Sequence, residues 1–283
     1  MTAVISKIIS MQPSLTVIEN EIAQYVMKHA EDVVTSTITA IAKSTNTSEA
    51  SINRFCKKLG FKGFNSFKVS LAQETYYNTI KELNEFEDTT FISSVSRDYR
   101  QMIVNTSAML DEGVVSQAVE IIKTAPRIYI FSSSVAAFAA SEFEFKLSMV
   151  GLNVKLITDT NNMRMLSSGV QANDLVAAVV PTIYMRDIYQ SINMCKERGA
   201  KILSITSHDS PKLSDLVDFK FVTSDKITAR NSLSLSNNLM SLYVVDVLYG
   251  ALLESDKNLR QKKLNSDVML GSNQMIDNYM IEF

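Results

Sequence analysis

Five short apolar runs, separated from one another by helical stretches, constrain the fold of this chain most. Runs of this kind that alternate with helices are typical of a parallel sheet flanked by helices. We therefore predict an α/β domain, in which ligands bind beyond the carboxyl ends of the strands. Three predicted loops lie at that edge, over 132–135, 181–187 and 207–212. The runs are RIYIF (127–131), NVKLIT (153–158), DLVAAVV (174–180), KILSIT (201–206) and FKFVT (219–223).

The first 70 residues lack this alternation and predict an all-α domain. Apolar residues spaced three and four apart predict an amphipathic helix within 14–32 and a second, shorter helix within 35–45. A third helix is predicted over 48–60, where Ser48 can cap the amino end and Gly60 can terminate the helix.

The second and third of these helices have the spacing of a helix-turn-helix. Ala42, Asn46 and Ile52 stand where such a motif needs a small residue, a turn residue and a core residue. Asparagine suits the turn because it tolerates the left-handed conformation better than most residues. The third helix then presents a polar face of the kind that enters a major groove.

The charge of the chain is unevenly distributed. Residues 40–70 contain six basic residues and one acidic residue, a net charge of +5, whereas the whole chain has a net charge of −2. This asymmetry indicates a basic module attached to an acidic body.

Asn53 and Arg54 are residue types that read adenine and guanine edges. The alternative is a helical bundle whose basic residues are merely solvated. The candidate DNA contacts are Lys43, Thr47, Ser48, Glu49, Ser51, Asn53, Arg54, Lys57, Lys58, Lys62 and Lys68.

A specific resemblance emerges from the segment STNTSEASINRFCKKLGFKGFNSFKVSLAQE. It resembles the hallmark of the RpiR-type transcription regulators, R-F-x-x-x-L-G-[FY]-x-G-[FY]-x-x-F-[KR], which runs here from Arg54 to Lys68 without a mismatch. The resemblance implies an N-terminal helix-turn-helix domain joined to a C-terminal SIS domain, a sugar-isomerase-like α/β fold that senses phosphosugars. The expected partners are double-stranded DNA with a palindromic operator, a phosphosugar or related effector, and a second copy in a homodimer or homotetramer.

The effector loops depart from the pattern of that family. Its phosphosugar-binding members typically carry a G-x-G-S-S-like loop after the first strand, and alignment places Ser132 and Ser134 at the two glycines. We therefore expect the backbone freedom that lets such a loop approach a phosphate to be lost. The second loop, typically S-x-S-G-x-T, reads VPTIYMR and keeps only the Thr182 hydroxyl. The candidate ligand contacts are Ser132, Ser133, Ser134, Thr182, Arg186 and Ser207.

Three interpretations of these loops remain open: a rebuilt phosphosugar site, a site for a different ligand, and a domain kept only for dimerisation. An enzyme, namely a SIS-type phosphosugar isomerase or lyase, is the rival class, since isomerisation needs a base. The chain contains only two histidines that could act as a base, His29 and His208. No G-x-S-x-G elbow surrounds the three serines 132–134. We therefore expect no catalytic residue, and the large α/β body argues against a protein that only binds DNA.

The remaining expectations concern the setting of the protein. Its two cysteines, Cys56 and Cys195, form no ligand-spaced cluster, and no apolar run approaches the length of a membrane span. We expect a cytoplasmic protein with no metal, cofactor or membrane contact. A long leucine-rich helix is predicted within 227–255, and it belongs either to the core or to a dimer contact. The predicted domains are a helix-turn-helix domain (1–76), a helical linker (77–106), a SIS-like effector and dimerisation domain (107–254) and a C-terminal helical tail (255–283).

Overall fold

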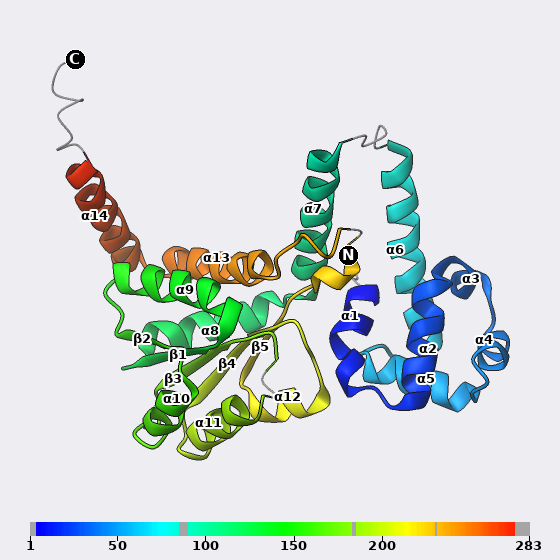
Figure 1. Cartoon of the computed structure of the whole chain (residues 1–283), viewed down its shortest axis with the longest axis horizontal. Coiled ribbons are helices and arrows are strands. Elements are labelled where there is room, and N and C mark those ends of the chain that lie inside the picture. Colours follow the sequence, from blue (N-terminus) through cyan, green and yellow to red (C-terminus); the bar gives the residue numbers. More distant parts are fainter. Residues whose placement is uncertain (1–3, 85–89, 183–184, 230, 275–283) are drawn as a thin grey trace. The chain divides into compact units, whose positions relative to one another are not determined.

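The computed structural model describes residues 4–84, 90–182, 185–229 and 231–274 (Figure 1). These residues form two compact units. The first comprises Met1–Leu110 with the segments Thr206–Asp215 and Val222–Met240, and the second comprises Asp111–Ile205, Leu216–Phe221 and Ser241–Phe283. Two residues of the predicted loop 181–187, at positions 183 and 184, lie outside the described residues.

The first unit begins with six helices around one apolar core. Their bounds are α1 (Val4–Met11), α2 (Val17–Lys28), α3 (Ala30–Thr35), α4 (Ile38–Ser44), α5 (Glu49–Lys58) and α6 (Phe64–Asn84), with a 3₁₀ turn, η1 (Gln12–Ser14), after α1. Phe55 and Phe67 lie at the centre of the core, where their rings meet edge to face with centroids 6.2 Å apart. Aromatic pairs prefer this arrangement.

The sequence predicted one helix where the structure has two, and it missed α1. The prediction of a continuous helix within 14–32 is wrong, because α2 ends at Lys28 and α3 begins at Ala30. His29 lies between them with φ −129° and ψ 38°, which are not helical values. At the other end of α2, Thr16 and Glu19 form a reciprocal capping box, which fixes the start of the helix.

The same unit contains α7 (Phe91–Met109) and η3 (Lys226–Thr228). Met102 of α7 packs with Leu235 and Met240 in a small second core. Asp98 is buried beside them, and its carboxylate accepts hydrogen bonds from the backbone N–H and the side-chain amide of Asn231, at 3.0 and 2.8 Å. These contacts hold the 222–240 segment against α7.

The second unit is built on a five-stranded sheet, as predicted. Its strands follow the order β2-β1-β3-β4-β5, and β1 pairs in parallel with β2 and β3, as β3 does with β4. The central strand β3 is buried throughout. The bounds are β1 (Ile128–Ser132), β2 (Val154–Ile157), β3 (Leu175–Val179), β4 (Lys201–Thr206) and β5 (Phe219–Val222).

Helices cover both faces of this sheet (Figure 1). On one face lie α8 (Glu112–Thr124), α9 (Ala137–Met149) and α13 (Asn238–Ser255), and on the other α10 (Thr160–Ser167) and α11 (Arg186–Glu197). The direction of the chain changes at β1, since β2 lies on one side of it and β3 on the other. Right-handed crossovers therefore place α9 and α10 on opposite faces. A short 3₁₀ turn, η2 (Ser134–Ala136), precedes α9, α12 (Pro211–Leu216) joins β4 to β5, and α14 (Lys257–Gln274) ends the described chain.

An ion pair between a half-buried arginine and a buried aspartate fixes the amino ends of β1 and β3. Arg127 donates from Nε and Nη2 to the two carboxylate oxygens of Asp174, at 3.0 and 2.6 Å, and Asp174 is fully buried. This pairing raises the pKa of Arg127.

The leucine-rich helix, whose role the sequence left open, is α13, and its side chains Val244, Leu248 and Leu252 are buried within the chain.

Candidate DNA-binding surface and effector loops

The helix-turn-helix consists of α4 and α5, and the predicted special residues have the predicted conformations. Ala42 and Ile52 are buried, and Asn46 turns the chain with φ 50°. The side chain of Ser48 accepts a hydrogen bond from the backbone N–H of Ser51 and so caps α5. Gly60, with φ 88°, ends this segment. The position of α5 is therefore fixed by the Ser48 cap at its amino end, by the turn at Gly60 after its carboxyl end, and by its buried apolar face.

The predicted DNA contacts divide into exposed and half-buried residues. Thr47, Ser51, Asn53, Lys58 and Lys68 are half-buried. The exposed set places four cations on α4, on α5 and on the turn that follows α5, and it consists of Lys43, Ser48, Glu49, Arg54, Lys57 and Lys62. Arg54 and Lys57 project from α5 itself, where a recognition helix would meet the grooves of DNA.

Three of the half-buried residues use their polar atoms within the domain. Asn53 Oδ1 accepts a hydrogen bond from the backbone N–H of Phe64 at 3.1 Å, which ties α5 to the first residue of α6. Lys58 Nζ donates to Glu19 Oε2 at 2.7 Å and to the carbonyl of Ser14 at 2.9 Å. Lys68 Nζ donates to the carbonyl of Ser36 at 2.7 Å. These three side chains therefore position the helices of the domain.

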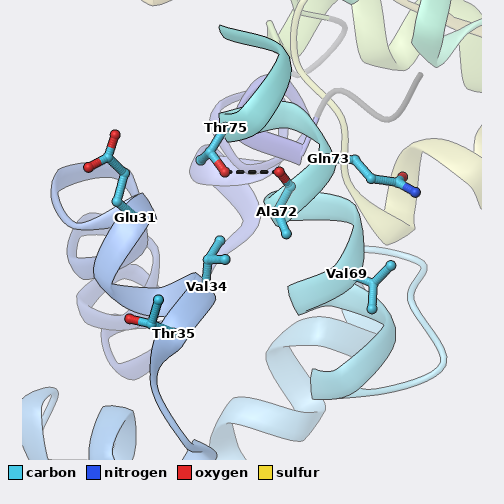
Figure 2. A pocket seen from close by; sticks show the side chains of 7 residues that line it. All are labelled: Glu31, Val34, Thr35, Val69, Ala72, Gln73 and Thr75. Atoms are coloured by element: carbon cyan, nitrogen blue, oxygen red, sulfur yellow. Dashed lines mark hydrogen bonds between the residues drawn. The ribbon is translucent and has the colours of Figure 1, made fainter. Parts of the chain in front are cut away.

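Two hollows occur in the same domain. One, of about 460 Å³, lies beside Asn53, Lys62 and Phe64, next to the recognition helix. The other, of about 640 Å³, lies between α3 and α6 and is shown in Figure 2. Val34 and Val69 line this second groove, and none of its lining residues is a cation, so its chemistry does not suit DNA phosphates.

The serine loop after β1 corrects one expectation. Ser134 has φ 54°, the left-handed conformation that favours glycine. The prediction that this loop loses its glycine-like backbone is wrong at this residue. Ser132 is fully buried and donates its hydroxyl to the carbonyl of Val179 at 2.6 Å, across the β1–β3 pair. Ser133 is half-buried and Ser134 is exposed. Solvent therefore reaches Ser133 and Ser134 but not Ser132.

The loop after β3 meets the serine loop. Ser133 Oγ lies 3.9 Å from Met185 Sδ, so the two loops approach each other at Met185. Thr182 is half-buried, and Arg186 is exposed at the first residue of α11. The amino end of a helix favours anions because its first N–H groups and its dipole point outward there. Arg186 adds a positive charge to this end.

Ser207 belongs to the segment Thr206–Asp215, which is part of the first unit. It is buried, and its Oγ lies 3.4 Å from Nδ1 of His208. His29, the other histidine, lies 3.4 Å from an Asp32 carboxylate oxygen. Within the described part of the chain, no group of three or more His, Cys, Asp or Glu residues is placed to hold a metal ion.

The sequence missed a contact between the first helix and two loops that follow strands. Asp209, after β4, donates its backbone N–H to the carbonyl of Ser10 in α1 at 2.6 Å. Ser224, after β5, has its Oγ 3.4 Å from Ser6 Oγ. The pattern VISKIISM contains the signal, because two serines four residues apart alternate with apolar residues.

Two family profiles match separate parts of the chain. The family profile described as helix-turn-helix domain, rpiR family, matches residues 2–77, and the SIS domain profile matches residues 121–251. An HTH-type transcriptional regulator of Clostridium perfringens is 26% identical over 237 residues, 82% of this chain and 85% of that protein. The regulator HexR of Pseudomonas aeruginosa is 23% identical over 197 residues, 68% of this chain and 69% of HexR.

Two solved structures show the same fold. The Vibrio vulnificus NanR protein, solved in complex with ManNAc-6P, aligns with a TM-score of 0.59 at 21% identity and covers 97% of this chain and 100% of that one. The sugar isomerase domain of an RpiR transcription factor from Sphaerobacter thermophilus aligns with a TM-score of 0.55 at 16% identity, over 64% of this chain and 97% of that one. No helix within the described ranges is long and apolar enough to cross a membrane.

Proposed function

We propose that this chain, which matches the rpiR-family helix-turn-helix profile and the SIS domain profile, is a transcription regulator that binds a palindromic operator, and that a phosphosugar at the SIS domain sets the occupancy of this operator. The observation that carries the proposal is the exposed basic surface of the helix-turn-helix, formed by Lys43, Arg54, Lys57 and Lys62. Lys and Arg at these positions neutralise phosphates, and the resulting affinity depends strongly on salt.

In this proposal Arg54 and Lys57 are the recognition-helix residues that enter the major groove. Arg54 has the fork geometry that pairs with a guanine edge. Ser51 orients it, since Arg54 Nη2 donates to Ser51 Oγ at 3.3 Å. Asn53, Lys58 and Lys68 act instead by holding the surrounding helices, because Asn53 Oδ1 and the Nζ atoms of both lysines are already engaged within the domain.

The effector is proposed to bind where the loops after β1 and β3 meet. Ser133 and Ser134 supply hydroxyls, and Arg186 with the first N–H groups of α11 favours an anion. The left-handed backbone at Ser134 supports this placement, because it preserves a glycine-like loop shape without glycine. ManNAc-6P, the ligand bound to NanR, is the first probe that this reasoning suggests. Ser132, Thr182 and Ser207 remain candidate contacts of the effector.

The functional form is proposed to be a homodimer or a tetramer built from dimers. Two recognition helices related by a two-fold axis read half-sites about 34 Å apart, which is one turn of DNA. An effector that favours one arrangement of the subunits changes the operator affinity by its differential affinity for the two arrangements.

The rival function is a SIS-type phosphosugar isomerase or lyase, and a binding experiment separates the two classes. Genomic fragments are selected on the full chain to find an operator, and Kd is measured at fixed salt for the wild type and for R54A/K57A. We expect the double variant to lose at least about tenfold in affinity. Turnover of a phosphosugar by a protein with no operator would overturn the proposal.

The effector is identified by thermal shift of the full chain against a phosphosugar panel that includes ManNAc-6P. A ligand that binds only the native state raises the unfolding temperature by mass action. Inorganic phosphate at equal concentration controls for simple anion binding. The variants R186A and S134A are expected to abolish the shift, whereas K155A, on the exposed side of β2, is expected to retain it. A shift unchanged in R186A and S134A would place the effector elsewhere.

A further inference from the structure

Helix α1 is buried on two opposite sides. Val4, Ile8 and Met11, spaced four and three apart, join the apolar core of the helix-turn-helix domain. Ser6 and Ser10, four apart, are each 2% exposed. At 3.6 residues per turn these two sets lie on opposite faces of the helix. A helix with one apolar and one small polar face, both buried, has a partner on each side.

The partner of the serine face is a pair of loops that follow strands. Asp209, after β4, donates its N–H to the carbonyl of Ser10 at 2.6 Å. The Ser10 carbonyl is one of the last four carbonyl groups of α1, and these groups accept no hydrogen bond from an N–H within the helix. Ser224, after β5, lies 3.4 Å from Ser6, oxygen to oxygen.

The two loops are tied to each other as well as to α1. Thr223 donates its backbone N–H to the carbonyl of Thr206 at 2.9 Å. Ser224 donates its N–H to Oγ1 of Thr106, which is fully buried in α7. These bonds join the β4 loop to the β5 loop, and both loops contact the same face of α1.

The other side of α1 is fixed to the DNA-binding domain. In addition to the apolar packing, the N–H groups of Val4 and Ile5 donate to Oε2 of Glu74, at 2.6 and 3.4 Å. Glu74 lies on α6, whose first residue is held by Asn53 of the recognition helix. A displacement of α1 therefore acts on the helices that position α5.

We infer that α1 is the coupling element between the loops after β4 and β5 and the helix-turn-helix, with the Ser6 side chain and the backbone carbonyl of Ser10 as its contacts to those loops. The inference rests on the proposed function, since it requires an effector at the carboxyl edge of the sheet. An effector that alters the loops after β4 and β5 would act through α1 on α5. By linkage, operator binding must bias the same loops.

The contact itself is tested by a cross-link in the full chain. The S6C/S224C pair places two thiols where the hydroxyls lie 3.4 Å apart, and both native cysteines are buried. A disulfide needs only a small adjustment from that separation. Under mild oxidation we expect an intrachain disulfide, identified by peptide mass, that S6C and S224C alone do not form. No cross-link, or a covalent dimer, would overturn the proposed contact.

The coupling is tested on the same variant. With the thiols reduced, ManNAc-6P is expected to change the operator Kd by about fivefold or more, the usual range of allosteric coupling. With the disulfide formed, the ratio of Kd values with and without ManNAc-6P is expected to fall to about one, because α1 can no longer shift against the β5 loop. An equal response in both forms would overturn the inference.

A matched pair of variants checks that result without a cross-link. S10A keeps a small side chain and the carbonyl that Asp209 contacts, so we expect a wild-type response to ManNAc-6P. S10L forces a larger side chain into a buried face and is expected to lose the response while it still binds operator. A full response in S10L would contradict the role of this face.

Failure of the proposed effector remains distinguishable from failure of the coupling. If calorimetry shows that ManNAc-6P binds neither form, the effector assignment is wrong. The coupling is then read with DNA alone, as the thiol–disulfide equilibrium of S6C/S224C in a glutathione buffer. Operator DNA is expected to shift this equilibrium by about fivefold or more, and no shift would overturn the coupling.

Discussion

Asn53 Oδ1 accepts a hydrogen bond from the backbone N–H of Phe64 at 3.1 Å, so the recognition helix caps the helix that follows it. The first N–H groups of a helix have no partner within the helix, and an asparagine oxygen is among their best acceptors. A residue type that can read adenine therefore serves here to join α5 to α6.

We predict that N53A lowers the free energy of unfolding of the full chain by about 1 kcal/mol, because the cap is lost. N53D keeps an acceptor oxygen at the amino end of α6 and is expected to retain the wild-type stability. Urea denaturation measures both. If N53A has unchanged stability but loses operator selectivity, Asn53 contacts a DNA base and does not act as a cap.

Lys57 and Lys58 are adjacent but differ in environment, so they form a matched pair. Lys57 is exposed, whereas Lys58 Nζ is bound to Glu19 and to the carbonyl of Ser14. We predict that K57A reduces the salt dependence of operator binding by about one phosphate contact. K58A is expected to change that slope less and to lower the unfolding temperature more. Equal slopes in the two variants would show that both lysines contact DNA.

Glu74 makes the stability of the first unit depend on pH. Burial raises its pKa from 4.5 to about 7, even though the N–H groups of Val4 and Ile5 lower it. The folded state therefore binds more protons than the unfolded state between these values, and stability falls as pH rises through this window. E74Q stays neutral and still offers an oxygen to Val4.

We predict that E74Q gains stability relative to the wild type as pH rises from 4.5 to about 7, by up to about 3 kcal/mol. Unfolding temperatures of both proteins across this range measure the difference. The exposed Glu21 provides the control, and E21Q is expected to follow the wild-type profile. Parallel profiles for E74Q and the wild type would show that folding does not raise the pKa of Glu74.

Ser134 is held in a conformation that costs a non-glycine residue about 1–2 kcal/mol. We predict that S134G raises the free energy of unfolding by about 1 kcal/mol, since glycine adopts φ 54° without strain. The neighbouring Ser133 has φ −145°, an extended value, so S133G is expected to destabilise instead. Chemical denaturation of the two variants should give opposite signs, and the same sign would argue against strain at Ser134.

The parts of this structure that follow from local pattern were predictable. The strands appear as apolar runs because a parallel sheet is buried on both faces, and β3 is buried along its length. The helix-turn-helix was readable for a different reason, since Ala42, Asn46 and Ile52 each satisfy a local steric requirement. The cap of α5 by Ser48 is likewise a bond between neighbours in sequence.

The parts that depend on distant partners were not predictable. Nothing local in the sequence indicates that Lys58 binds Glu19, or that Ser132 donates a hydrogen bond to the carbonyl of Val179. Helix α1 is only eight residues long, and helices that short are marginal without tertiary packing. Its existence depends on Glu74 and on loops that lie far away in the sequence.

That separation also orders events during synthesis. Ser10 leaves the ribosome early, but its carbonyl can accept the hydrogen bond from Asp209 only after residue 209 has been synthesised. Ser6 can contact Ser224 only later still. At translation rates of about 5–20 residues per second the delay is on the order of 10–40 seconds. During this interval the serine face of α1 has no partner, because residues 209 and 224 have not yet been synthesised.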